Sequence, residues 1–223
     1  MCGVGNMEAI TQAGYLCNDY GLDTISAGST IGFAMECYEK GVLSKSDTGG
    51  LELKFGDTEL MIDLVHKIVR REGIGDLLAE GTKRMSEKLG KGTERFAMHV
   101  KGLELPAYDS RALQLSGLTY ATANRGGDHI TAYVQGPMLL DYPWLCVDES
   151  RVKDAYKADP SEVFVAKDLE DTLTVFDCAG ACKFMRMGLA AAEWMDLIRY
   201  GLGWMDFTIE EFRTLGERVY NLA

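Results

Sequence analysis

The sequence predicts a mainly α, multihelical protein with few or no strands. Apolar residues recur at helical spacing along most of the 223 residues, and capping residues or glycines bound these stretches. Alternating, strand-like segments are scarce. Hydrophobic residues make up 47% of the chain and charged residues 26%, as in ordinary globular proteins that bury a core.

The first two predicted helices end at glycines. Met7–Tyr20 is expected to form a helix that stops at Gly21, because glycine readily adopts the left-handed conformation found after helix ends. Thr24–Lys40 is expected to form the second helix, which stops at Gly41. The polar, glycine-rich segment 45–56 is predicted to be a surface loop.

Two amphipathic helices and one extended segment are expected next. Asp57 is the predicted N-cap of a helix that runs to Gly73, and Ile74–Leu89 is expected to form a single further helix. Residues 96–103 alternate in polarity and predict a short strand or an extended crossing. The stripe that the Asp57-capped helix buries comprises Leu60, Met61, Leu64, Val65, Ile68 and Val69.

The second half of the chain is expected to be helical around one irregular stretch. Helices are predicted over 111–124, 161–176 and 190–200. Between them, residues 126–160 hold several glycines and prolines, and irregular stretches of that length are often functional. Thr208-Ile-Glu-Glu211 has the spacing of a capping box and predicts the start of the last helix.

Charge and composition exclude several classes of protein. A net charge of −11 argues against binding to nucleic acid, which requires a basic face, and disfavours docking on anionic lipid. No stretch of 18 uninterrupted apolar residues predicts a membrane span, and the first residues show no secretory signal pattern. We therefore expect a cytoplasmic protein. Its six cysteines are too sparse for a disulfide framework and indicate reduced core thiols or metal ligands.

The first candidate site is the sequence Asn18-Asp-Tyr-Gly-Leu-Asp23. It places an amide and two carboxylates at a sharp turn between two predicted helices. Asp23 can cap the free N–H groups of the second helix. The turn is therefore either a ligand-binding segment or only a capped corner.

The second candidate site is the sequence Asp177-Cys-Ala-Gly-Ala-Cys182, followed by Lys183. Its thiols are four residues apart, so on a helix they would face one way. They predict either part of a metal or iron–sulfur site or a buried structural pair of thiols. The segment resembles Asn18–Asp23 in its order of polar residue, glycine, and then Asp or Cys, and this match suggests two equivalent halves of one ligand site.

The third candidate site is the sequence Arg125-Gly-Gly-Asp-His129. Its glycines allow close approach of backbone to a ligand, and Arg125 can bind a phosphate through two hydrogen bonds. His129 can donate a proton near neutral pH. A glycine-rich turn with a surface histidine is the alternative. His66 and His99 lie within apolar or alternating patterns and are expected to be structural.

Together these motifs make the chain similar to a known family. It resembles the carboxy-terminal part of the tungsten-containing aldehyde ferredoxin oxidoreductases, along nearly its whole length. That resemblance implies two helical domains, which we expect at 1–105, the central type and incomplete at its N-terminus, and at 106–223. The stretches that carry it are Cys17–Ser26, Phe33–Glu36, Gly102–Arg111, Arg125–His129 and Asp177–Cys182.

The resemblance implies oxidation of aldehydes to carboxylic acids at a tungsten (or molybdenum) bis-pterin, with electrons passed through a [4Fe-4S] cluster to ferredoxin. Each of the two matched motifs would bind one pterin. In the first, Gly21, Leu22 and Asp23 are kept, whereas Asn18 stands where the family usually has Asp, so that a charge is lost.

In the second motif, Asp177 and Gly180 fit the family pattern, and Ala181 stands where Leu is usual. Cys182 would be the fourth thiolate of the cluster, and the backbone of Lys183 would lie near the pterin. Cys178 has no role that the resemblance assigns.

In the third motif, Arg125 would hold cofactor phosphate, and His129 would lie close to the metal as a proton donor or substrate-polarising group. Some members have a cofactor-binding lysine two residues after this histidine. Thr131 occupies that position here, which weakens the expected phosphate contact.

The family's Cys-x2-Cys-x3-Cys motif and its β-rich domain are not in this sequence. We therefore expect a fragment or subunit that is inactive alone, completed by an N-terminal half or a partner subunit, and associating as a homodimer or complex. The alternative is a non-catalytic helical remnant or assembly subunit, which the substitutions at Asn18, Thr131 and Ala181 favour.

Overall fold

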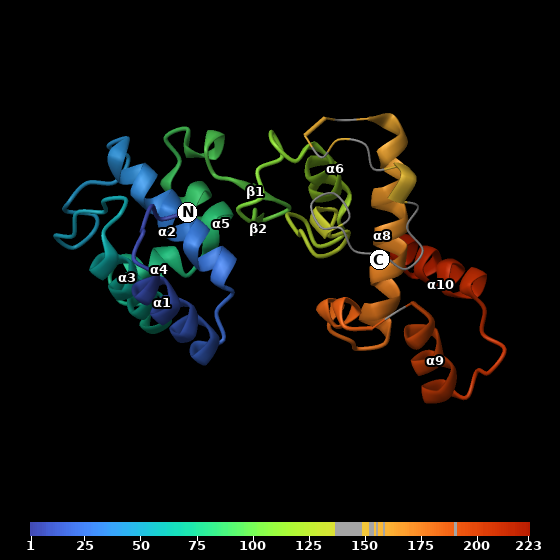
Figure 1. Ribbon diagram of the computed structural model, residues 1–223. Helices are drawn as coiled ribbons and strands as arrows, with labels where there is room; N and C mark the ends of the chain where they lie inside the picture. Colours follow the sequence, from blue (N-terminus) through green and yellow to red (C-terminus); the bar gives the residue numbers. More distant parts are fainter. Residues whose placement is uncertain (137–148, 152–153, 155, 158, 190) are drawn as a thin grey trace. The chain divides into compact units, whose positions relative to one another are not determined.

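The computed structural model describes residues 1–136, 149–151, 154, 156–157, 159–189 and 191–223. These residues form two compact units, Met1–Ala107 and Tyr108–Ala223. The described part of the chain is mainly helical and has one small two-stranded sheet, which confirms the predicted fold class (Figure 1). Of the irregular stretch, Pro137, Pro143 and Cys146 lie outside the described residues.

The first unit is built from five helices, a single 3-10 turn and a hairpin within the described range. In chain order these elements are α1 (Met7–Tyr20), α2 (Thr24–Glu39), α3 (Thr58–Arg70), α4 (Ile74–Leu78), α5 (Gly81–Leu89), η1 (Thr93–Arg95), β1 (His99–Val100) and β2 (Leu103–Glu104).

The core of this unit lies between the helices α1 to α5. Helix α3 packs on α1 and α4, and α2 packs on α5. Asp57 caps α3 as predicted, because its carboxylate accepts a hydrogen bond from the N–H of Leu60 at 3.0 Å. The largest buried side chains of the unit include Ile31, Met35, Leu53, Leu64, Leu78 and Met85.

The prediction of one helix over Ile74–Leu89 was wrong. The segment forms α4 and α5, and Gly81, the first residue of α5, has a φ of +77°, outside the range of a right-handed helix. Buried Glu104 of β2 accepts a hydrogen bond from the N–H of Thr82 at 2.7 Å and so satisfies a donor at the start of α5. The break therefore depends on a carboxylate from a distant segment.

Two other helix boundaries differ from the sequence-based expectation, whereas the short strand expected within 96–103 is present. Helix α3 ends at Arg71, which adopts a φ of +51°, rather than at Gly73. The alternating segment forms the β1–β2 hairpin, in which the Nδ1 of His99 accepts a hydrogen bond from the N–H of Gly102. The helix expected at 111–124 is shorter, since Asp109 binds both the N–H and the guanidinium of Arg111 ahead of it.

The second unit is organised around the long helix α8. Helix α10 packs against α8 (Figure 1). The predicted capping box is confirmed: Thr208 accepts a hydrogen bond from the N–H of Glu211 and donates its own N–H to the Glu211 carboxylate. The elements of this unit are α6 (Gln114–Thr122), η2 (Glu149–Arg151), η3 (Pro160–Glu162), α8 (Val163–Cys178), η4 (Lys183–Met187), α9 (Ala191–Leu202) and α10 (Ile209–Leu222).

Across the residues that the structure describes, no helix combines the length and the apolar character needed to cross a membrane.

A buried carboxylate on α8 makes the stability of the second unit depend on pH. Glu170 is 8% exposed, and its Oε1 accepts a hydrogen bond from the hydroxyl of Thr122 at 2.8 Å. Burial raises the pKa of Glu170, because water no longer solvates the charged form. The folded state therefore holds this proton to a higher pH than the unfolded chain does.

We expect Glu170→Gln to flatten the pH dependence of unfolding. In the native protein, the raised pKa of Glu170 contributes stability below its ordinary value of 4.5, and this contribution is lost as the pH rises through the folded pKa. Urea titrations at several pH values would measure how the free energy of unfolding changes with pH. Glu217→Gln is the control, because Glu217 is half exposed and pairs with Lys167 at the surface. Equal pH profiles for Glu170→Gln and the unmodified protein would contradict the prediction.

Candidate functional site

The first matched motif folds as a tight corner at the end of α1. Gly21 adopts the left-handed conformation, with a φ of 70°. Its N–H donates to the carbonyl of Asn18 at 3.3 Å, and the N–H of Leu22 donates to the carbonyl of Cys17 at 2.8 Å. These bonds satisfy carbonyls that the helix end would leave free.

The second matched motif forms the same corner at the end of α8. Gly180 has a φ of 65°, and its N–H donates to the carbonyl of Asp177 at 3.0 Å. The N–H of Ala181 donates to the carbonyl of Phe176, also at 3.0 Å. The two motifs, which belong to different units, therefore share both the glycine conformation and the hydrogen-bond pattern.

The residue two positions after each glycine also has matching backbone angles. Asp23 has φ −68° and ψ 123°, and Cys182 has φ −65° and ψ 125°. The carboxylate of Asp23 caps α2 by accepting from the N–H of Ser26 at 2.7 Å. Cys182 comes just before η4, but its side chain makes no capping hydrogen bond to that turn, and the residue is exposed. One corner thus uses this position as a helix cap, whereas the other presents a thiol.

The expectation that Cys178 and Cys182 share one helix face was wrong, as was the alternative of a buried pair. Cys178 is the last residue of α8, and the left-handed Gly180 ends the helix before Cys182. Both residues are exposed. The expectation of reduced core thiols holds instead for Cys2, Cys17 and Cys37, which are buried and free; burial raises the pKa of each thiol.

The Arg125–Thr131 loop is ordered by a carboxylate. Asp128 is 5% exposed and accepts hydrogen bonds from the N–H of Ile130 at 2.8 Å and from the hydroxyl of Thr131 at 2.9 Å. Its other contact is an ion pair with the guanidinium of Arg125 at 3.1 Å. The side chain of Arg125 is 69% exposed, so most of its donors face solvent.

His129 lies among aromatic rings. Its ring centroid is 5.5 Å from that of Tyr108 and 6.4 Å from that of Tyr133, whose ring meets Phe184 edge-on at 5.5 Å. The hydroxyl of Tyr120 donates to the carbonyl of Tyr108 at 3.0 Å, and burial raises the pKa of Tyr120 to about 12. Tyr120 therefore stays protonated at neutral pH and keeps this hydrogen bond.

Lys183 joins the second and third motifs. Its ammonium lies 2.8 Å from the carboxylate of Asp177 and 3.3 Å from the carbonyl of Ile130, and its side chain is 10% exposed. The structure thus brings the Asp177–Lys183 segment together with the loop that carries Arg125, His129 and Thr131. Asn18, Gly21, Leu22 and Asp23 form the matching corner in the first unit.

Sequence reasoning missed Asp128 and the two tyrosines around His129. The Asp128 carboxylate bonds the N–H two residues later, which is an Asx turn, and an Asp after two glycines is a recognisable signal for one. No local pattern places Tyr108 beside His129, because 20 intervening residues fold back to bring their rings together.

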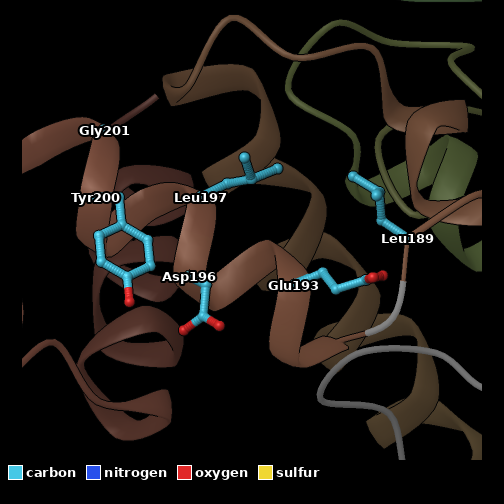
Figure 2. A pocket seen from close by; sticks show the side chains of 6 residues that line it. All are labelled: Leu189, Glu193, Asp196, Leu197, Tyr200 and Gly201. Carbon is cyan, nitrogen blue, oxygen red and sulfur yellow. The ribbon is translucent and has the colours of Figure 1, made fainter.

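A separate pocket of about 520 Å³ lies along α9. Figure 2 shows Glu193, Asp196, Leu197 and Tyr200 projecting from this helix, with Leu189 ahead of it. None of the residues predicted as a site lines this pocket.

The donor groups of the second corner fit the cofactor that the resemblance implies, provided that further ligands come from elsewhere. The Asp177 side chain is 61% exposed and retains an oxygen for a pterin N–H, while Cys182 offers an exposed thiol. Within the described ranges, no group of three or more His, Cys, Asp or Glu residues could hold a metal ion. One thiolate cannot complete a [4Fe-4S] cluster, so the fit covers one cluster ligand only.

Comparison with known proteins identifies the same family that the sequence motifs resemble. The family described as "Aldehyde ferredoxin oxidoreductase, domains 2 & 3" matches residues 1–223. Tungsten-containing aldehyde ferredoxin oxidoreductases of Pyrococcus abyssi and Thermococcus kodakarensis are 41% and 40% identical over 98% of this chain. The chain spans about a third of the length of these relatives, namely 35%.

More distant relatives share parts of the chain or its fold. An "Aliphatic sulfonate oxidoreductase, WOR-like subunit" from Pyrococcus furiosus is 41% identical over 57% of this chain and 21% of its own length. The solved active-site complex BamBC of benzoyl coenzyme A reductase matches with a TM-score of 0.63 and 25% identity, over 92% of this chain and 35% of that one. The chain therefore belongs to the aldehyde ferredoxin oxidoreductase family and corresponds to its domains 2 and 3.

Proposed function

We propose that this chain is the cofactor-cradling helical part of a tungsten (or molybdenum) bis-pterin oxidoreductase. It oxidises aldehydes to carboxylic acids and passes the electrons through a [4Fe-4S] cluster to ferredoxin. The remaining cluster ligands come from polypeptide other than residues 1–223. The chain spans 35% of the length of its relatives and acts only together with the polypeptide that supplies the rest.

The observation that carries the proposal is the pair of matching corners. Gly21 and Gly180 share a left-handed conformation, and the residues two positions later share backbone angles, as two sites for two similar halves of a cofactor should. Asp23 caps a helix, whereas Cys182 presents an exposed thiol. Only the second corner is therefore equipped to ligate iron.

The chain's own residues have distinct roles around the cofactor, which supplies the redox centre when bound. Asn18, Leu22 and Asp23 in one corner, and Asp177 with the Lys183 backbone in the other, bind the pterins. Arg125 is mostly exposed and pairs with cofactor phosphate, with Thr131 alongside. Cys182 binds iron.

His129 moves a proton. Oxidation of an aldehyde with water to a carboxylate releases two electrons and three protons, so a base beside the reacting carbon is needed. The rings of Tyr108 and Tyr133 lie beside the imidazole, with centroids 5.5 and 6.4 Å from its own, and contribute to its positioning.

Elemental analysis of the untagged chain, purified anaerobically from its source with whatever copurifies, tests the proposal. We expect about one tungsten or molybdenum and about four irons per chain, the content of one bis-pterin metal and one cubane. Absence of all three metals would contradict the proposal and favour the helical remnant or assembly subunit. Light scattering on the same sample tests the predicted homodimer or complex.

A further inference from the structure

The ammonium of Lys183 links two segments that are 53 positions apart in the sequence. It forms an ion pair with Asp177 at the end of α8 and donates to the backbone carbonyl of Ile130. Only a tenth of the Lys183 side chain is exposed, although the Asp177 carboxylate at the other end of the ion pair is 61% exposed. This contrasts with surface lysine pairs such as Lys157–Asp154, where the lysine is 81% exposed.

Each end of this link lies next to a residue with a proposed role. Lys183 follows Cys182 directly, and Ile130 follows His129. The N–H of Ile130 is itself fixed by Asp128, so the carbonyl that receives the ammonium belongs to an ordered loop. The Lys183 ammonium therefore connects the segment of the proposed iron ligand with the segment of the proposed proton donor.

We propose that Lys183 is a positioning residue that sets the His129 loop against the Cys182 turn. The roles of Cys182 and His129 rest on the proposed function, but the link itself is a property of this chain. Lys183 also follows the proposed iron ligand directly in the sequence, and a positive charge beside a bound cluster would favour its reduced, more negative form. Lys183 thus connects the loop that carries the proton-transfer residue, His129, to the turn that carries the iron ligand, Cys182.

The full 223-residue chain, without cofactor, allows a direct test by NMR. In Lys183→Met, we expect the side-chain signal of His129 to shift or broaden, while those of His66 and His99, which lie in the first unit, stay in place. Amide hydrogen exchange at Ile130 and Ala181 should become roughly tenfold faster, which corresponds to about 1.4 kcal/mol of lost local stability. Because the chain has three histidines, the His129 signal can be assigned by substitution.

Two further variants separate positioning from general stability. Lys167→Met removes another Lys–Asp pair of the second unit, at 2.6 Å on α8, and should leave the His129 signal unchanged. Lys183→Arg keeps the positive charge and should restore part of the His129 signal and of the exchange protection. An unchanged His129 signal in Lys183→Met, or an equal change in Lys167→Met, would overturn the proposal.

In the metal-loaded protein, Lys183→Met should lower the reduction potential of the cluster, and Lys183→Arg should return it towards the original value. If no metal is found in the unmodified protein, the proposed function fails while the NMR test of the link still stands. If metal is present and both the His129 signal and the potential are unaffected by Lys183→Met, the link fails and the proposed function remains.

Discussion

Cys182→Ala is expected to abolish the iron–sulfur cluster in the assembled protein. The second corner presents this thiol exposed and without a capping hydrogen bond, as an iron ligand requires. A cubane needs four thiolates, so the loss of one should reduce iron from about four per chain towards zero and remove the visible absorption of the cluster. Iron analysis and absorption spectra after anaerobic reconstitution with the polypeptide that supplies the other ligands would measure this.

Cys178→Ala is the matched control for this experiment. Cys178 is also exposed, but it is the last residue of α8, ahead of the Gly180 turn. It should therefore keep the full iron content. A cluster that survives Cys182→Ala, or one that disappears equally in both variants, would remove Cys182 from its proposed role.

Gly216→Ala is expected to destabilise the second unit by about 3 kcal/mol, the upper end of the usual cost of overpacking. Gly216 is buried on α10, where this helix lies alongside α8. A Cβ atom built there would overlap the carbonyl oxygen and carbon of Asp171. Since that obstacle is backbone rather than a flexible side chain, the two helices would have to separate. The free energy of unfolding, from urea titration followed by circular dichroism, checks the prediction.

Gly201→Ala gives the opposite expectation within the same unit. Gly201 lies in α9, and no atom lies within 4 Å of a Cβ built at this position. Alanine loses less backbone entropy than glycine in a helix, so this variant should gain up to about 1 kcal/mol. Equal effects of the two substitutions would show that α8 and α10 do not pack closely at Gly216.

Local signals in the sequence were sufficient for most helices and their caps. Asp57 and the Thr208–Glu211 capping box were recognisable because each acts through hydrogen bonds to residues within one turn. The end of α1 at the left-handed Gly21 follows from a preference of glycine itself. The two matched motifs were recognisable for the same reason, because each is a short segment whose backbone geometry depends on its own residues.

The break between α4 and α5 was not predictable in this way. Apolar spacing continues through Gly81, but the N–H of Thr82 is satisfied by Glu104, which lies 22 residues later. The orientation of the two cysteines also depended on where α8 stops, and a four-residue spacing indicates one face only if the helix continues.

Residue patterns alone were sufficient to predict the helical class, the family and the segments that carry the candidate site. The tertiary structure decided how those segments meet within the second unit: Asp128 orders the Arg125–Thr131 loop, Lys183 joins it to Asp177, and Tyr108 lies against His129. The physical reason is the range of the interactions involved. Caps and periodicity act over one or two turns, whereas a buried cation is placed by all the chain that folds around it.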